Sequence, residues 1–121
     1  MKVKIDTKEK FDVIRIEEPF LSANMTEKLS ELLLPYLTTV VKNIILKMDC
    51  VITTEATTAE AILNIQQKFY DNHQSFVICE LQPGVEKFLD EKGWLELMNV
   101  TPTESEAWDI VQMEEIEREF Q

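Results

Sequence analysis

The chain has 121 residues, of which 45% are hydrophobic and 29% charged, and this balance excludes a disordered or fibrous protein and predicts one domain over residues 1–121. The formal net charge of −11 repels phosphate backbones and anionic lipid headgroups, so it argues against nucleic-acid and membrane partners. The acidic surface either keeps the protein in solution or attracts a basic protein partner. The two cysteines, Cys50 and Cys79, form no metal-binding motif, and we expect no metal and no cofactor.

Signals for targeting and for catalysis are absent from the sequence. Residues 1–6 contain no apolar run of the signal-peptide type and no stretch is long enough to span a bilayer, which predicts a cytoplasmic protein. Gly84 and Gly93 are the only glycines, so no glycine-rich phosphate loop is present. The only histidine, His73, has no nucleophile motif around it, and we expect it to lie in a surface loop. The sequence therefore predicts no catalytic residues and no enzyme.

The first 40 residues predict a hairpin followed by a helix. Val3 and Ile5 alternate with lysines, and β-branched residues resume over residues 11–16, which is typical of two antiparallel strands. The first strand lies at an edge where a second chain could pair, although its lysines discourage such pairing, and the oligomeric state stays open. Asn24 followed by Glu27 predicts a capped helix start, and Pro35 predicts that the helix bends or stops near Leu34.

The remainder of the chain alternates between strands and helices. Residues 44–48 form a continuous apolar run, which is typical of a central strand, and residues 76–79 form another with a helix over 57–70 between them. Such a unit implies two parallel strands joined by a right-handed crossover. We then expect a helix over residues 83–92, capped at its C-terminal end by Gly93, and an edge strand near 98–100. The last helix opens with a hydroxyl cap near Thr101–Thr103. The sequence predicts an α/β fold.

The segment between the central strand and the second helix is the most informative candidate site. Ligand and regulatory sites favour the carboxyl ends of strands in open α/β sheets. One explanation of these residues is structural: Thr57 and Glu60 fit a helix capping box, and this explanation is as good as a functional one. The functional hypothesis is that a phosphate on such a hydroxyl adds about two negative charges to the surface offered to a partner. The candidate binding and regulatory loop consists of Thr53, Thr54, Glu55, Ala56, Thr57 and Thr58.

Four stretches of the sequence, in this order, resemble the STAS family, the domain of sulfate transporters and anti-sigma-factor antagonists. Residues 43–51 (NIILKMDCV) look like the family's central strand, and Glu55-Ala56-Thr57-Thr58 follow it at the expected distance. Residues 85–95 (VEKFLDEKGWL) and 103–107 (TESEA) resemble two later family helices. The resemblance covers nearly the whole chain. It implies a STAS-like α/β fold, with a central mixed sheet of four to five strands and about four helices.

The regulatory motif departs from the family pattern. Antagonists of this type carry Asp-Ser-Ser/Thr-Gly, in which a partner kinase phosphorylates the first hydroxyl. An ungapped reading places Glu55, Ala56, Thr57 and Thr58 on these positions, so alanine replaces the usual phosphoacceptor serine. Thr57 and Thr58 are then the candidate phosphoacceptors, and Glu55 keeps a negative charge beside them.

The resemblance implies a bacterial regulatory module that binds other proteins in a partner-switching signalling system and so regulates transcription. Its expected partner is an anti-sigma factor or serine-kinase-like protein, or a signalling scaffold. The alternative hypothesis is a diverged STAS domain that binds a small ligand, or scaffolds a signalling complex without phosphorylation. A polar pocket beside Glu55 would favour that alternative.

Overall fold

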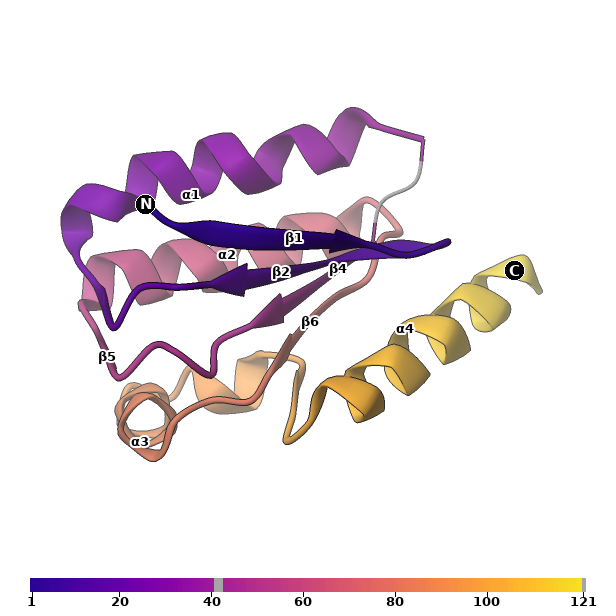
Figure 1. Ribbon diagram of the computed structural model, residues 1–121. Helices are drawn as coiled ribbons and strands as arrows, with labels where there is room; N and C mark the ends of the chain where they lie inside the picture. The colour runs from indigo at the N-terminus through magenta and orange to yellow at the C-terminus, as the bar shows by residue number, and fades with distance from the viewer. Residues whose placement is uncertain (41–42, 121) are drawn as a thin grey trace.

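A five-stranded mixed sheet forms the centre of the protein (Figure 1). The computed structural model describes residues 1–40 and 43–120. The strands lie in the order β1-β2-β4-β6-β7, in which β1 and β2 are antiparallel and all other neighbours are parallel. Their bounds are β1 Val3–Thr7, β2 Phe11–Ile16, β4 Asn43–Lys47, β6 Phe76–Cys79 and β7 Val100–Thr101. The predicted hairpin, the central strand and the parallel crossover are confirmed.

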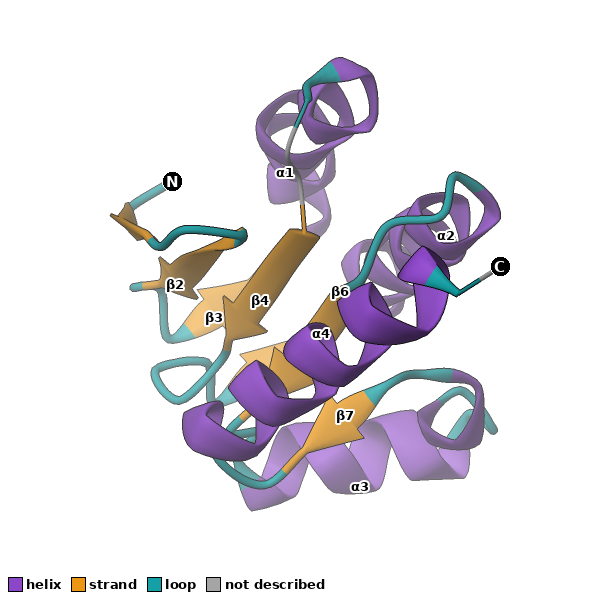
Figure 2. Ribbon diagram, turned by 90° about the vertical axis from the view of Figure 1, so that its right-hand side faces the viewer, coloured by secondary structure: helices purple, strands orange, loops and turns teal. Residues whose placement is uncertain are grey.

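Helices cover both faces of this sheet (Figure 2). One face carries α1 (Thr26–Leu33) and α2 (Ala56–Asp71), with α3 (Pro83–Glu91) beside them near β7. The opposite face carries α4 (Glu104–Glu119), which packs on β4, β6 and β7 and leaves the β1 end of that face open. The predicted α/β fold, with a central mixed sheet of four to five strands and about four helices, is therefore confirmed.

Alternation along the strands produces two separate hydrophobic layers. In β4, Ile44 and Leu46 point toward α1 and α2, whereas Ile45 points toward α4, because successive side chains of a strand lie on opposite faces. Phe69 of α2 packs edge-to-face on Phe76 of β6, with ring centroids 5.1 Å apart. All five side chains are fully buried, so the sheet is covered tightly where β4 and β6 cross the molecule.

Helix ends agree with the sequence-based predictions except at two starts. Pro35 ends α1 at Leu33, and a 3-10 helix (Leu34–Thr38) continues from it. Thr103 caps α4 by accepting a hydrogen bond from the Glu106 amide at 3.2 Å. The predicted Asn24 cap is wrong, because Asn24 lies inside a 3-10 turn (Ala23–Met25) that precedes α1, and Met25 occupies the N-cap position of α1. The second wrong prediction, at the start of α2, concerns the candidate site.

Candidate regulatory site

The loop that contains residues 53–58 is held by a second, small sheet that the sequence did not predict. β5 (Thr53–Thr54) pairs in parallel with β3 (Phe20–Leu21), so that Phe20 lies opposite Thr53. The Ile52 amide donates a hydrogen bond to the Pro19 carbonyl at 2.8 Å, and the Glu55 amide donates to the Leu21 carbonyl at 2.8 Å. These backbone bonds join two segments more than thirty residues apart and give the loop a defined shape.

Glu55 occupies the N-cap position of α2 but caps a different helix. Its backbone is extended, and its side chain makes no hydrogen bond to the first turn of α2. The carboxylate instead accepts a hydrogen bond from the Ala23 amide, at the first residue of the 3-10 turn before α1. The predicted capping box of Thr57 and Glu60 is wrong, because α2 already begins at Ala56 and no side chain caps it. In the described part of the chain, no side chain caps the amides of the first turn of α2.

The two candidate phosphoacceptors have opposite environments. Thr58 is completely buried, and its hydroxyl donates to the Ser22 carbonyl at 2.7 Å and lies 3.1 Å from the Thr26 hydroxyl. These contacts tie the first turn of α2 to the start of α1. Thr57 is exposed on the outer side of the same turn, and Ala56 is half-buried. Of the two threonines, only Thr57 presents its hydroxyl where a kinase can reach it without opening the fold.

Two exposed apolar side chains flank the loop, and the sequence reasoning missed them. The side chains of Phe20 and Ile52 are 44% and 60% exposed, although both are large and apolar. Both are neighbours of Thr53: Phe20 is its partner in β3, and Ile52 directly precedes it in the chain. Large apolar groups gathered on an exposed surface often mark a site of protein association. For Ile52, the signal in the sequence was a large apolar residue at the start of a polar loop, between Val51, which is buried, and Thr53.

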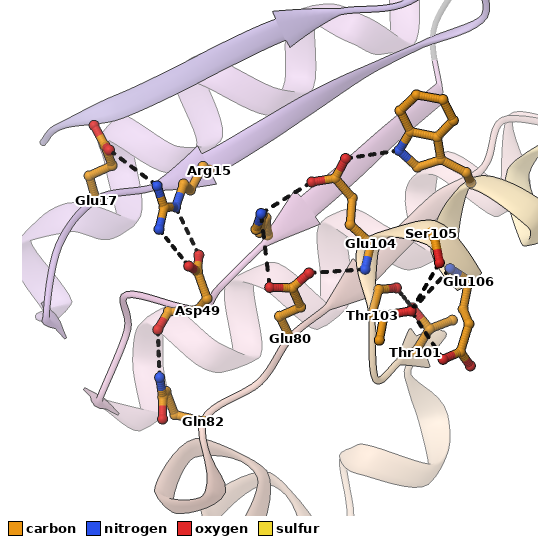
Figure 3. A network of polar contacts seen from close by, with 12 residues as sticks. Arg15, Glu17, Asp49, Glu80, Gln82, Thr101, Thr103, Glu104, Ser105 and Glu106 are labelled. Atoms are coloured by element: carbon orange, nitrogen blue, oxygen red, sulfur yellow. Dashed lines mark hydrogen bonds and ion pairs between the residues drawn. The ribbon is translucent and has the colours of Figure 1, made fainter.

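A network of charged side chains lies at the base of this loop, on the face of the sheet that carries α4 (Figure 3). Arg15 of β2 donates two hydrogen bonds to the Asp49 carboxylate, at 2.9 and 2.5 Å. This hydrogen-bonded ion pair holds the pKa of Asp49 below its ordinary value. Gln82, just before α3, donates to the Asp49 carbonyl at 2.6 Å. The network therefore anchors the segment that leads from β4 to Thr53.

The same network continues toward α4. Lys47 lies 3.9 Å from Glu80 and 3.3 Å from Glu104, and the Glu104 carboxylate also accepts a hydrogen bond from the Trp108 indole at 3.0 Å (Figure 3). Glu80 adopts a positive φ of 58° and accepts from the Glu104 amide at 3.0 Å. Each of these carboxylates has its partners within the chain, so the network joins elements to one another and offers little to an outside ligand.

Other chemistry-bearing residues lie apart from the loop. His73 is exposed and follows α2 at its C-terminal end, about 20 Å along the helix from Thr57. Cys79 is buried, and burial raises the pKa of its thiol to about 12. Within residues 1–40 and 43–120, no group of three or more His, Cys, Asp or Glu side chains is placed to hold a metal ion. No helix in the described part of the chain has the length and apolar character needed to cross a membrane.

A cavity beside the loop is too small for a ligand larger than water. It lies under Thr54, between α2, α3 and the ends of β4 and β6, and its volume is about 10 Å³, which is room for no more than one water molecule. Apart from Thr54 its lining is apolar: Met48, Ala59, Ile62, Ile78, Leu81, Val85, Leu89 and Met98. This cavity is not the polar pocket that the ligand-binding alternative requires.

Solved structures of the same fold include anti-sigma-factor antagonists. A candidate anti-sigma factor antagonist from Thermotoga maritima matches with a TM-score of 0.78 and 16% identity, over 91% of this chain and 94% of that chain. RsbS from Moorella thermoacetica, solved as a variant, matches with a TM-score of 0.76 and 19% identity, over 93% and 96%. The Bacillus cell fate determinant SpoIIAA, in its phosphorylated form, matches with a TM-score of 0.67 and 16% identity, over 91% and 99%.

At these identities the structural matches show a common fold. Among curated proteins, none matches this sequence. The model of the STAS domain family matches residues 2–107, which include all five strands of the central sheet and the whole candidate loop. The chain belongs to the STAS domain family.

Proposed function

We propose that this protein is a regulatory binding module of the anti-sigma-factor-antagonist type, acting in a partner-switching system in the bacterial cytoplasm. We define the site loop as Phe20, Ile52, Thr53, Thr54, Glu55, Ala56, Thr57 and Thr58. Its exposed side chains form the binding surface, and the buried Thr58 supports them through its hydrogen bond to the Ser22 carbonyl. The partner is an anti-sigma factor or a serine-kinase-like protein. The module acts by binding rather than by catalysis.

The observation that carries this proposal is the exposure of Phe20 and Ile52 next to Thr53, in the loop that leads into the first turn of α2, where Thr57 is also exposed. Aromatic and aliphatic side chains supply much of the binding free energy when a partner buries them, whereas isolated surface hydroxyls supply little. The β3–β5 pairing holds both side chains in place before binding, which lowers the entropy lost on association. The first turn of α2 begins three residues after Thr53, so we expect a partner that covers Phe20 and Ile52 to extend over that turn.

The charge state of this turn would control the association. In the ungapped alignment Ala56 replaces the usual phosphoserine, so the exposed hydroxyl one position later takes its place. A kinase would transfer the terminal phosphoryl group of ATP to the Thr57 oxygen and release ADP, adding about two negative charges to the first turn of α2. The helix N-terminus stabilises such a charge, but a partner surface that must be desolvated on binding does not. Phosphorylation would therefore release the partner.

The test is a pull-down from the native cytosol with wild type, Thr57→Glu and Thr57→Val, followed by identification of bound proteins by mass spectrometry. We expect wild type and Thr57→Val to capture an anti-sigma factor or kinase-like protein, and Thr57→Glu to lose it because of the added charge. Equal capture of that protein by all three would place the binding surface elsewhere.

The captured kinase then tests the phosphoacceptor. With labelled ATP, wild type should be labelled and Thr57→Val should not, whereas the double variant Ala56→Ser/Thr57→Val should regain labelling at the usual family position. Labelling of Thr57→Val at the wild-type level would contradict the assignment of Thr57.

A further inference from the structure

Strand β1 forms one edge of the central sheet (Figure 1). Its backbone groups that do not bond to β2 follow a regular pattern. The Lys2 carbonyl accepts from the Glu17 amide at 2.9 Å, and the Lys8 amide donates to the Phe11 carbonyl at 2.9 Å. In an antiparallel pair, alternate residues bond to the neighbouring strand, so the even-numbered residues of β1 bond to β2. The odd-numbered residues direct their N–H and C=O groups outward, where no other part of the described chain pairs with them: Val3, Ile5 and Thr7.

We propose that this edge pairs with β1 of a second copy of the chain, in antiparallel register centred on Ile5, to give a dimer with one continuous sheet. In this register Ile5 faces Ile5 of the second copy, Val3 faces Thr7, and Lys4 faces Asp6. All three outward-directed residues then form hydrogen-bonded pairs, each with two backbone hydrogen bonds.

The charges along β1 complement one another in this register. Lys4 and Asp6 form a non-hydrogen-bonded pair, the kind in which facing side chains come closest. The twofold symmetry produces this pair twice, and opposite charges directly across two strands are stabilising. Asp6 already lies 3.1 Å from Lys8 of its own chain, so it would bridge two lysines. Lysines on an edge strand normally prevent pairing with other strands, but here they favour this one partner.

The apolar residues of β1 lie on one face of the sheet, and they would meet their counterparts from the second copy. Val3 lies opposite Ile16 of β2 and Ile5 opposite Ile14, so both side chains share the face that carries α1 and α2. The Ile5 side chain is 45% exposed because no strand lies beyond β1. Pairing across the twofold axis would place the two Ile5 side chains against each other and bury them.

The overall charge distribution favours this edge over other surfaces for self-association. Two copies that each carry a net charge of −11 repel each other. The first 15 residues, however, carry five basic and three acidic side chains, whereas residues 16–121 carry the remaining seven basic and twenty acidic ones. The hairpin is therefore the part of the chain where two copies approach with the least repulsion.

Sedimentation equilibrium over a range of protein concentrations tests the proposal. Wild type should show a reversible monomer–dimer equilibrium. Lys4→Asp and Asp6→Lys should each weaken dimerisation about tenfold, because each converts two attractive pairs into two repulsive ones. The double variant Lys4→Asp/Asp6→Lys should restore it, because exchanging the two charges keeps every pair opposite. If the single variants lost the dimer because they were misfolded, combining them would not restore it.

Ile5→Pro provides a second test of the edge. Proline is tolerated on an edge strand where the lost N–H faces solvent, so the β1–β2 bonds should remain while the dimer is lost. Circular dichroism checks that this variant is folded. A wild type that stays monomeric at millimolar concentration, or a dimer that the single charge reversals leave unchanged, would overturn the proposal. Partner capture through the site loop does not depend on either result.

Discussion

The site loop and the charged network between β2, β4 and α4 both lie at the carboxyl ends of strands. They differ in whether their side chains find partners within the chain. In the network, Arg15 pairs with Asp49, and Lys47 pairs with Glu104, which joins β4 to α4. In the site loop, Thr57 and two large apolar side chains face solvent. A high density of charged residues therefore does not by itself identify a binding surface. Side chains that stay exposed and have no partner within the fold indicate a binding surface better.

The largest expected effect is on partner binding when an exposed apolar side chain of the site loop is shortened. Phe20→Ser should weaken binding of the captured partner at least thirtyfold, because loss of a buried aromatic anchor costs about 2 kcal/mol or more. The matched control is Met113→Ser on α4, where the wild-type side chain is 48% exposed and lies outside the site loop. Isothermal titration calorimetry measures both variants, and an equal loss for both would remove the distinction between the two regions.

A second prediction separates the two threonines within the loop. Thr58→Val should lower the free energy of unfolding by about 1–3 kcal/mol, because it removes a buried hydroxyl that donates to the Ser22 carbonyl. Thr57→Val should change it by no more than about 0.5 kcal/mol, because the Thr57 side chain is exposed. Urea denaturation followed by circular dichroism measures the pair. Equal losses would show that Thr57 also has a structural role.

The smallest expected effect concerns the network and depends on pH. Arg15 holds the pKa of Asp49 below its ordinary value of 3.8, so the ionised carboxylate stabilises the folded state above that pH. This contribution is lost as the pH falls through the pKa of the folded state. The difference in unfolding free energy between wild type and Asp49→Asn should therefore be largest near pH 7 and shrink below pH 4. A difference that is constant with pH would show that the ion pair does not stabilise the fold.

The sequence predicted the fold well because its signals are local. The continuous apolar run of β4, the interruption at Pro35 and the Thr103 cap each depend on a few neighbouring residues, and each lies where the pattern indicated. The capping predictions for Asn24 and Thr57 were wrong because tertiary contacts decide them. Glu55 reaches across to the Ala23 amide, and the α2 start is set by the β3–β5 pairing, which no local pattern reveals.

The candidate site was predicted only in part for the same reason. The sequence identified the segment from Thr53 to Thr58, because it follows a buried strand and opens a helix. It did not include Phe20, which comes close to Thr53 only through the small second sheet. It also treated Thr57 and Thr58 alike, although the packing of α1 against α2 buries one hydroxyl and leaves the other exposed.

Hydrogen–deuterium exchange of the protein with and without its captured partner tests the central claim most directly, because it reports on both regions at once. Partner binding through the site loop predicts slower exchange over residues 19–24 and 52–58, with little change over residues 47–49, 80–82 and 101–106 of the network. Slower exchange confined to the network and α4, with the loop unchanged, would contradict this claim. The binding surface would then lie on the face of the sheet that carries α4.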